Sequence, residues 1–202
     1  MAWIGRTAKA GAHGRRSLWR DQRGMAAVEL ALIMPVALLM LGLAVYGGEG
    51  LGIQRKVTLA TRDVTDLVSQ TVSTGAVNSV ANANLNQSTL DYYLSLSSLI
   101  VYPYDPSVLQ VVVSEIQVTS GSTTGTVVWS ESYNGGTARA VGSSVAVSST
   151  LTGAGATYLL LGESQYTYTP VGLANLLGAM TISGQIFMIP RQTTQISIIW
   201  GS

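Results

Sequence analysis

The 202-residue sequence contains no cysteine and only one histidine, His13. These absences exclude a disulfide framework, a thiolate zinc site, a cysteine nucleophile and any site built from several histidines. Charged residues are also scarce, at 10% of the chain against about 25% in typical soluble domains, whereas hydrophobic residues reach 47%. This composition argues against an ordinary cytosolic protein, and the length suits one modest domain with an anchor.

The few charges are divided unevenly along the chain. Residues 1–23 hold six basic residues and one acidic residue, and residues 24–202 hold five basic and nine acidic residues. Between these two parts lies the apolar run Met25–Tyr46, in which Glu29 is the only charged residue. As a helix the run would be about 33 Å long, slightly more than the roughly 30 Å hydrocarbon core of a bilayer. We therefore expect a transmembrane helix over residues 25–46.

The charge asymmetry predicts the orientation of this helix, because the basic side of a span usually stays in the cytoplasm. Residues 1–24 are expected to be a cytoplasmic leader, and the chain after about Gly47 is expected to be extracytoplasmic. The basic leader could instead bind nucleic acid, but topology alone accounts for its charge, and we expect no nucleic-acid partner. The run could also be a cleaved secretory signal, because Val45 and Gly47 are small residues at positions −3 and −1 before Gly48.

The start of the apolar run has an unusual arrangement. Glu29 lies inside it, where a carboxylate costs up to about 2.5–3.5 kcal/mol at mid-membrane and usually has a partner. Cleavage after Gly24 would create a new amine at Met25 and make Glu29 the fifth residue of the product. The amine of one subunit could then neutralise the carboxylate of a neighbour as their helices pack together.

The string Arg23–Leu32, RGMAAVELAL, with Pro35 close behind, resembles the TadE/TadG family of the bacterial tight-adherence (Flp) pilus machinery. That family's most specific feature is the pattern RGxxAVEFALxxP, in which Leu30 here replaces the phenylalanine. The resemblance implies a pilin-like fold and a leader cut by a prepilin peptidase between Gly24 and Met25. It further implies a minor pilin or pseudopilin that primes or caps pilus assembly at the inner membrane, together with sibling pseudopilins and the major pilin.

Two features should disturb the regularity of the helix. Pro35 removes a backbone hydrogen bond within the apolar run and should kink the helix there. Four glycines between Gly47 and Gly52 weaken the next segment, because each costs about 1 kcal/mol relative to alanine in a helix. This segment could be a hinge or could allow close helix packing through small residues, and the sequence leaves both open.

Residues 47–73 are expected to form this hinge and an amphipathic helix, because apolar residues recur at spacings of three and four. The stripe consists of Ile53, Val57, Ala60, Val64, Leu67 and Thr71. It should pack on the sheet of its own domain or on a neighbouring subunit. Asp63 and Asp66 could suggest an acid–base pair, but with Arg62 adjacent and no histidine nearby, a solvated helix face is expected.

Residues 74–202 predict a periplasmic α+β domain with an antiparallel sheet. Residues 73–87 are expected to be a loop, Ser88 the N-cap of a short helix that ends near Ser98, and Tyr102–Pro106 a stop. Strands are expected at 108–119, 126–132, 141–150, 157–169 and 180–189. The first should carry a bulge near Ser114–Glu115, and the second should lead into a hairpin turn at Tyr133–Gly136.

The sequence offers little that could support catalysis. It lacks the GxSxG, SxxK, P-loop and dinucleotide-binding patterns, and its acidic residues after the apolar run are scattered. We therefore expect no enzyme activity, cofactor, metal site or small-molecule substrate, and we expect Arg191 to make a salt bridge or carbonyl contact. The alternative to a minor pilin is an uncleaved single-pass membrane protein that presents an extracytoplasmic binding or adhesin domain.

Overall fold

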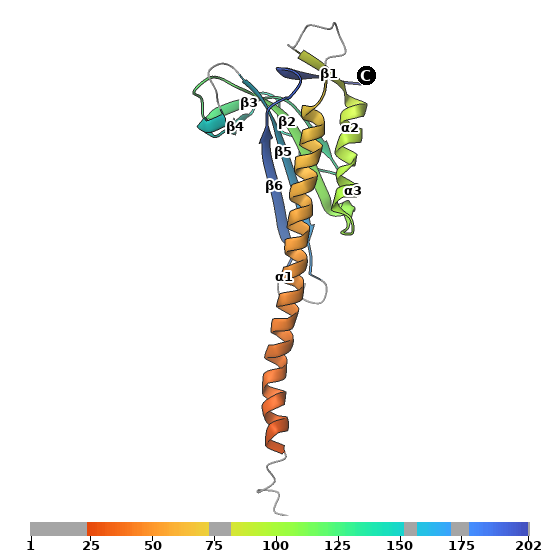
Figure 1. Ribbon diagram of the computed structural model, residues 1–202, viewed down its shortest axis with the longest axis vertical. Helices are drawn as coiled ribbons and strands as arrows, with labels where there is room; N and C mark the ends of the chain where they lie inside the picture. The colour runs from red at the N-terminus through yellow and green to blue at the C-terminus, as the bar shows by residue number, and fades with distance from the viewer. Residues whose placement is uncertain (1–23, 73–81, 152–156, 171–177, 202) are drawn as a thin grey trace, which may run out of the picture. The chain divides into compact units, whose positions relative to one another are not determined.

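The structure is a computed structural model that describes residues 24–72, 82–151, 157–170 and 178–201. The leader, residues 1–23, lies outside these residues. The chain divides into two compact units, Met1–Ala44 and Val45–Ser202, each described here by itself. The elements are α1 (Met25–Ser69), β1 (Asn82–Asn86), α2 (Gln87–Ser95), α3 (Ser97–Val101), β2 (Leu109–Val118), β3 (Thr124–Tyr133), β4 (Ser144–Ala146), β5 (Thr157–Tyr168), β6 (Met180–Met188) and β7 (Gln195–Ile199) (Figure 1).

The fold is α+β, with a long apolar N-terminal helix and an antiparallel sheet, as the sequence predicts. Helix α1 runs unbroken for 45 residues. It continues through Pro35 and through residues 47–52, so neither feature ends the helix. A hinge motion at residues 47–52 stays a prediction. The one close approach in that segment is at Gly52, where an added Cβ would collide with the hydroxyl of Tyr104.

The expected stripe of α1 packs on the sheet of its own domain. Ile53, Val57, Ala60 and Val64 are buried in one core with Leu109, Val111, Val113 and Leu160 of strands β2 and β5. The far end of the stripe differs from the expectation, because Val68 is buried while Leu67 and Thr71 are only half-buried. The helix therefore turns slightly relative to the predicted stripe over its last turns.

The main sheet has five strands in the order β4-β3-β2-β5-β6, and every neighbouring pair is antiparallel. A bulge lies at the expected place but on the neighbouring strand: Glu115 pairs with Trp129 and Ile116 with Val127, so the extra residue is Val128 of β3, whereas β2 pairs with β5 without a register shift. The expected turn is confirmed, because Asn134 and Gly135 both have positive φ, 55° and 76°. The return strand is shorter than expected, because the regular ladder with β3 covers only Ser144–Ala146, although Gly142 and Ser143 also exchange backbone hydrogen bonds with Val127 of β3.

Both faces of this sheet carry apolar side chains. One face packs against α1 and α2, and the other holds a second core that includes Ile116, Val118, Val127, Val145, Leu159 and Leu161. Glycines let α1 lie close to the first face. An added Cβ at Gly162 would overlap the Thr65 side chain, and one at Gly184 would crowd Thr61, whose hydroxyl lies 2.5 Å from that of Ser164.

The structure also contains a second sheet, of two strands, which was not predicted from the sequence. Strand β1 pairs in parallel with β7, from Asn82 opposite Gln195 to Asn86 opposite Ile199. The loop expected over residues 73–87 is therefore wrong for 82–86, and residues 73–81 lie outside the described chain. Ser88 is not an N-cap either: α2 is preceded by Asn86, makes no side-chain capping bond, and is followed at once by α3.

Candidate functional site

The first feature with functional consequences is the exposed apolar surface of α1. From residue 25 to residue 44 no side chain is buried, and Leu32, Val28 and Leu38 are 78%, 68% and 61% exposed. In the described part of the chain, α1 is the one helix that is long and apolar enough to cross a membrane. A helix that is apolar on all sides requires an apolar environment, which lipid or other helices can provide.

The four residues singled out from the sequence belong to this segment. Gly24 directly precedes α1, Met25 is its first residue, and Glu29 and Pro35 lie within it. Glu29 is exposed, and among the described residues no hydrogen bond or ion pair engages its carboxylate. The structure thus has, near the start of an exposed apolar helix and next to the predicted cleavage position, an acid that no other described residue engages.

The second feature is a carboxylate sealed inside the domain. Glu115 lies on β2 opposite the bulge of β3 and is fully buried. Its Oε1 accepts a hydrogen bond from the Ile196 backbone N–H at 2.7 Å, and its Oε2 accepts one from Trp129 Nε1 at 3.1 Å. Burial raises the pKa of Glu115 to about 7, although these hydrogen bonds act in the opposite direction. The Glu115 carboxylate therefore connects β7 to the main sheet, and because it is buried, a substrate cannot reach it.

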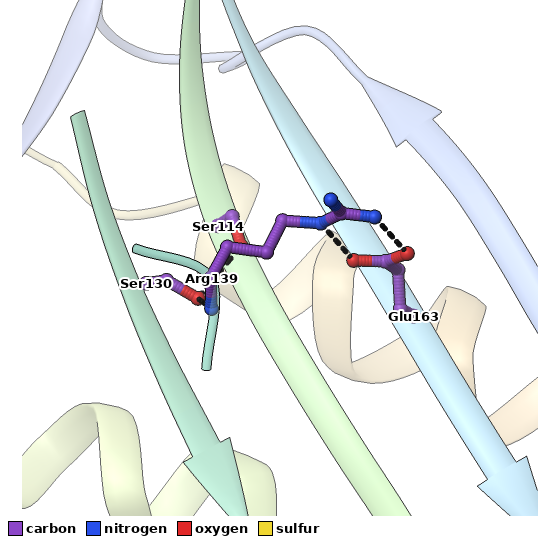
Figure 2. A network of polar contacts seen from close by, with 4 residues as sticks. All are labelled: Ser114, Ser130, Arg139 and Glu163. Atoms are coloured by element: carbon purple, nitrogen blue, oxygen red, sulfur yellow. Dashed lines mark hydrogen bonds and ion pairs between the residues drawn. The ribbon is translucent and has the colours of Figure 1, made fainter. Parts of the chain in front are cut away.

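A third polar group spans the opposite face of the sheet (Figure 2). Arg139 reaches across β2 and makes a bidentate contact with Glu163 of β5, with Nε and one terminal nitrogen at 2.6 and 2.7 Å from the two carboxylate oxygens. Its backbone N–H donates to Ser130 Oγ at 2.9 Å, and Ser114 Oγ donates to the same oxygen. The hydrogen bond to Glu163 raises the pKa of Arg139.

A cavity of about 350 Å³ adjoins this network and is lined by Gln110, Val112, Gly136, Thr137, Ala138, Arg139, Glu163, Ser164 and Gln165. The two charges of the cavity neutralise each other, so the remaining polar groups are amides and hydroxyls. The network fixes residues 136–139 on the sheet, and its bidentate geometry makes it a structural brace.

The domain part of α1 is held by two further polar contacts. Tyr168 of β5, 6% exposed, donates its hydroxyl to Glu49 Oε2 at 2.8 Å, and burial together with this carboxylate raises the Tyr168 pKa to about 12. Arg191 forms an ion pair with Asp66 at 2.6 Å, and its backbone N–H donates to the Ser69 carbonyl at 2.9 Å. The role expected for Arg191 is confirmed, whereas Asp66 is paired rather than freely solvated.

Within the described residues no group of three or more histidine, cysteine, aspartate or glutamate side chains could hold a metal ion. The sequence reasoning passed over Glu115, Trp129 and the Arg139–Glu163 pair. A signal was present for the first, since an acid inside the apolar strand VVVSEIQV demands a partner when buried. The partners of Glu115 come from β3 and β7, and the sequence alone does not indicate that pairing.

Comparison of the chain with protein-family models, with curated proteins and with solved structures gives no match. Function is therefore argued from the chain itself. Its most distinctive described surface is the exposed apolar segment of α1 with its single acid.

Proposed function

We propose that this protein is a TadE/TadG-like minor pilin, or pseudopilin, of the tight-adherence pilus system. The observation that carries the proposal is Glu29 on an exposed apolar helix that begins at Met25, directly after Gly24, where no other described residue engages its carboxylate. The RGMAAVELAL motif with Pro35 supports the same assignment by resemblance. An α+β domain with an antiparallel sheet, which follows the helix, is compatible with it.

In this proposal a prepilin peptidase cuts between Gly24 and Met25 and removes the basic leader. The mature helix then lies in the bacterial inner membrane, with its N-terminus toward the cytoplasm and the domain in the periplasm. The ammonium of Met25 on one subunit meets Glu29 of a neighbour. That contact would offset the cost of a carboxylate in lipid, about 2.5–3.5 kcal/mol at mid-membrane, and so favour side-by-side helices.

The partners proposed for the mature protein are sibling pseudopilins and the major pilin, with inner-membrane lipid around the helix. The periplasmic domain would prime or cap the growing filament. Its braces suit this role, because Tyr168–Glu49 and Arg191–Asp66 fasten the helix to the sheet and allow force on one to reach the other.

Processing is tested by co-expression with a prepilin peptidase, followed by mass spectrometry of the membrane-extracted protein. The expected product starts at Met25, and Gly24→Leu should block its formation. Gly48→Leu is the matched control, because an added Cβ meets no atom within 4 Å at either glycine. An uncut leader in the parent protein would support the alternative of an anchored binding domain, and a start at Gly48 would support ordinary secretion.

The role of Glu29 is tested separately from processing. Glu29→Ala should leave membrane insertion intact, because it removes a charge from the apolar run, but should lower piliation and crosslinking to sibling pseudopilins. Glu29→Asp retains the charge and should preserve part of the assembly. Normal piliation of Glu29→Ala would contradict the proposed pairing with the Met25 amine.

A further inference from the structure

The β1–β7 pair, here called the ribbon (residues 82–86 and 195–199), is attached to the main sheet around one carboxylate. Ala83, Leu85 and Ile196 of the ribbon are buried. The polar attachment is the backbone of Ile196, whose N–H donates to Glu115 and whose carbonyl accepts from Trp129 Nε1 at 2.6 Å. Trp129 Nε1 also lies 3.1 Å from Glu115, so the carboxylate, the indole and the Ile196 backbone form one connected set of hydrogen bonds.

This set contains no cation. The groups that hydrogen-bond Glu115 are the Ile196 N–H of β7, the Trp129 indole of β3 and the Gln195 side chain of β7. Its neighbour on β5 is Leu160. None of these groups titrates near neutral pH, and in the described chain no charged side chain shifts the pKa of Glu115. An ionised Glu115 would therefore place a full negative charge in the core with hydrogen-bond donors but no cation beside it, and desolvation outweighs those hydrogen bonds.

We propose that Glu115 is a proton-controlled latch, which holds the ribbon firmly on the five-stranded sheet when it is protonated and loosens it when it ionises. In the neutral form a carboxyl oxygen still accepts from the Ile196 N–H, and Trp129 keeps the Ile196 carbonyl. In the ionised form, release of the ribbon lets water reach the charge. This latch is independent of the proposed pilus function.

The direction of the pH dependence follows from linkage. Burial raises the pKa of Glu115 from 4.5 to about 7 in the closed structure. The closed form binds the proton more tightly than the open form, so protonation of Glu115 stabilises the closed form. This stabilisation is fully present below about pH 4.5 and is lost as the pH rises through about 7. Between pH 5.5 and 8.5 these two pKa values correspond to roughly a 30-fold change in the closing equilibrium.

The test is hydrogen–deuterium exchange of the full chain in detergent micelles at a series of pH values, corrected for intrinsic exchange. Protection of the ribbon should fall about 30-fold from pH 5.5 to 8.5, with a decrease of about tenfold per pH unit that levels off above pH 7, while protection of strand β5 should stay constant. Equal protection of the ribbon at pH 5.5 and pH 8.5 would overturn the latch.

Variants identify the titrating group. Glu115→Gln cannot ionise, so the ribbon should stay closed at pH 8.5 as it is at pH 5.5. Glu163→Gln removes an acid that pairs with Arg139 on the other face, and it should retain the full pH response. A Glu115→Gln protein whose ribbon still opens with rising pH would refute the assignment, and the titration of the parent protein decides the matter if that variant does not fold.

Discussion

The two parts of helix α1 have the same backbone geometry but opposite surroundings. Residues 25–44 bury no side chain, whereas residues 53–69 bury eight. The first part is apolar around its whole circumference, and the second has one buried stripe and a polar outer surface. A helix satisfies its own backbone hydrogen bonds in either setting, so the side chains alone decide whether it faces lipid or a sheet.

The buried stripe also shows how closely the second part is fitted. Thr61 and Thr65 lie on the sheet where Gly162 and Gly184 leave room, and their hydroxyls bond to the Val57 and Thr61 carbonyls at 2.8 and 2.6 Å. Small side chains whose hydroxyls hydrogen-bond to carbonyls of their own helix therefore allow α1 to lie close to the sheet without leaving polar atoms unpaired. The first part, with its large and flexible side chains, has no such fitted partner in the described chain.

Introducing charged residues should have the largest effect, and the effect should differ between the two parts of α1. Leu38→Arg with Leu41→Arg places two charges in the apolar part and should cost about 5–7 kcal/mol of membrane insertion. Leu51→Arg with Leu59→Arg alters two exposed leucines beyond the apolar run and should leave insertion unchanged. Alkaline extraction of membranes measures both. Equal extraction of the two double variants would show that the apolar part is no membrane span.

A single methyl group should reveal the close fit of the second part. Gly162→Ala drives a Cβ into Thr65 and should lower the free energy of unfolding by about 1–3 kcal/mol, measured by urea denaturation in detergent. Gly48→Ala adds the same methyl group in open space on helix α1 and should be neutral or slightly stabilising. Adding Thr65→Ala to Gly162→Ala should restore part of the loss, and a loss that Thr65→Ala leaves untouched would contradict the proposed collision.

The smallest effect concerns the contact that fastens α1 near the end of its apolar run. Tyr168→Phe keeps the buried ring and removes the hydrogen bond to Glu49, which should cost about 1 kcal/mol of unfolding free energy. Tyr158→Phe removes an exposed contact with Gln117 at 3.2 Å and should cost less. Urea midpoints separate the two, and indistinguishable midpoints would mean that Glu49 finds equally good partners in water.

Sequence periodicity predicted what depends on local pattern. The spacing of Ile53, Val57 and Val64 predicted a buried helix face, and the β-branched run after Val108 predicted the central strand, although the bulge expected on it lies on β3. The apolar run from residue 25 to residue 46 predicted a helix that could cross a membrane. In each case the residues responsible lie within a few turns or one strand of one another.

Features that depend on distant partners were not predicted. Asn82–Asn86 is polar enough to resemble a loop, and it is a strand only because β7 pairs with it and Ala83 and Leu85 are buried. The contact of the Arg139 side chain with Glu163 of β5 joins residues 24 positions apart, and no local pattern indicates it. Glu115 was visible as an anomaly, but its hydrogen bonds require Ile196, 81 residues further along the chain.

The ribbon has a consequence for the order in which the domain can fold. Strand β7 follows every other described strand in the chain, yet Glu115 and Trp129 need the Ile196 backbone to complete their hydrogen bonds. A nascent domain that lacks β7 therefore leaves one carboxylate oxygen of Glu115 without its backbone donor, and a contact between residues so distant in the chain is entropically slow to form. The domain can complete this polar centre only after β7 has been synthesised.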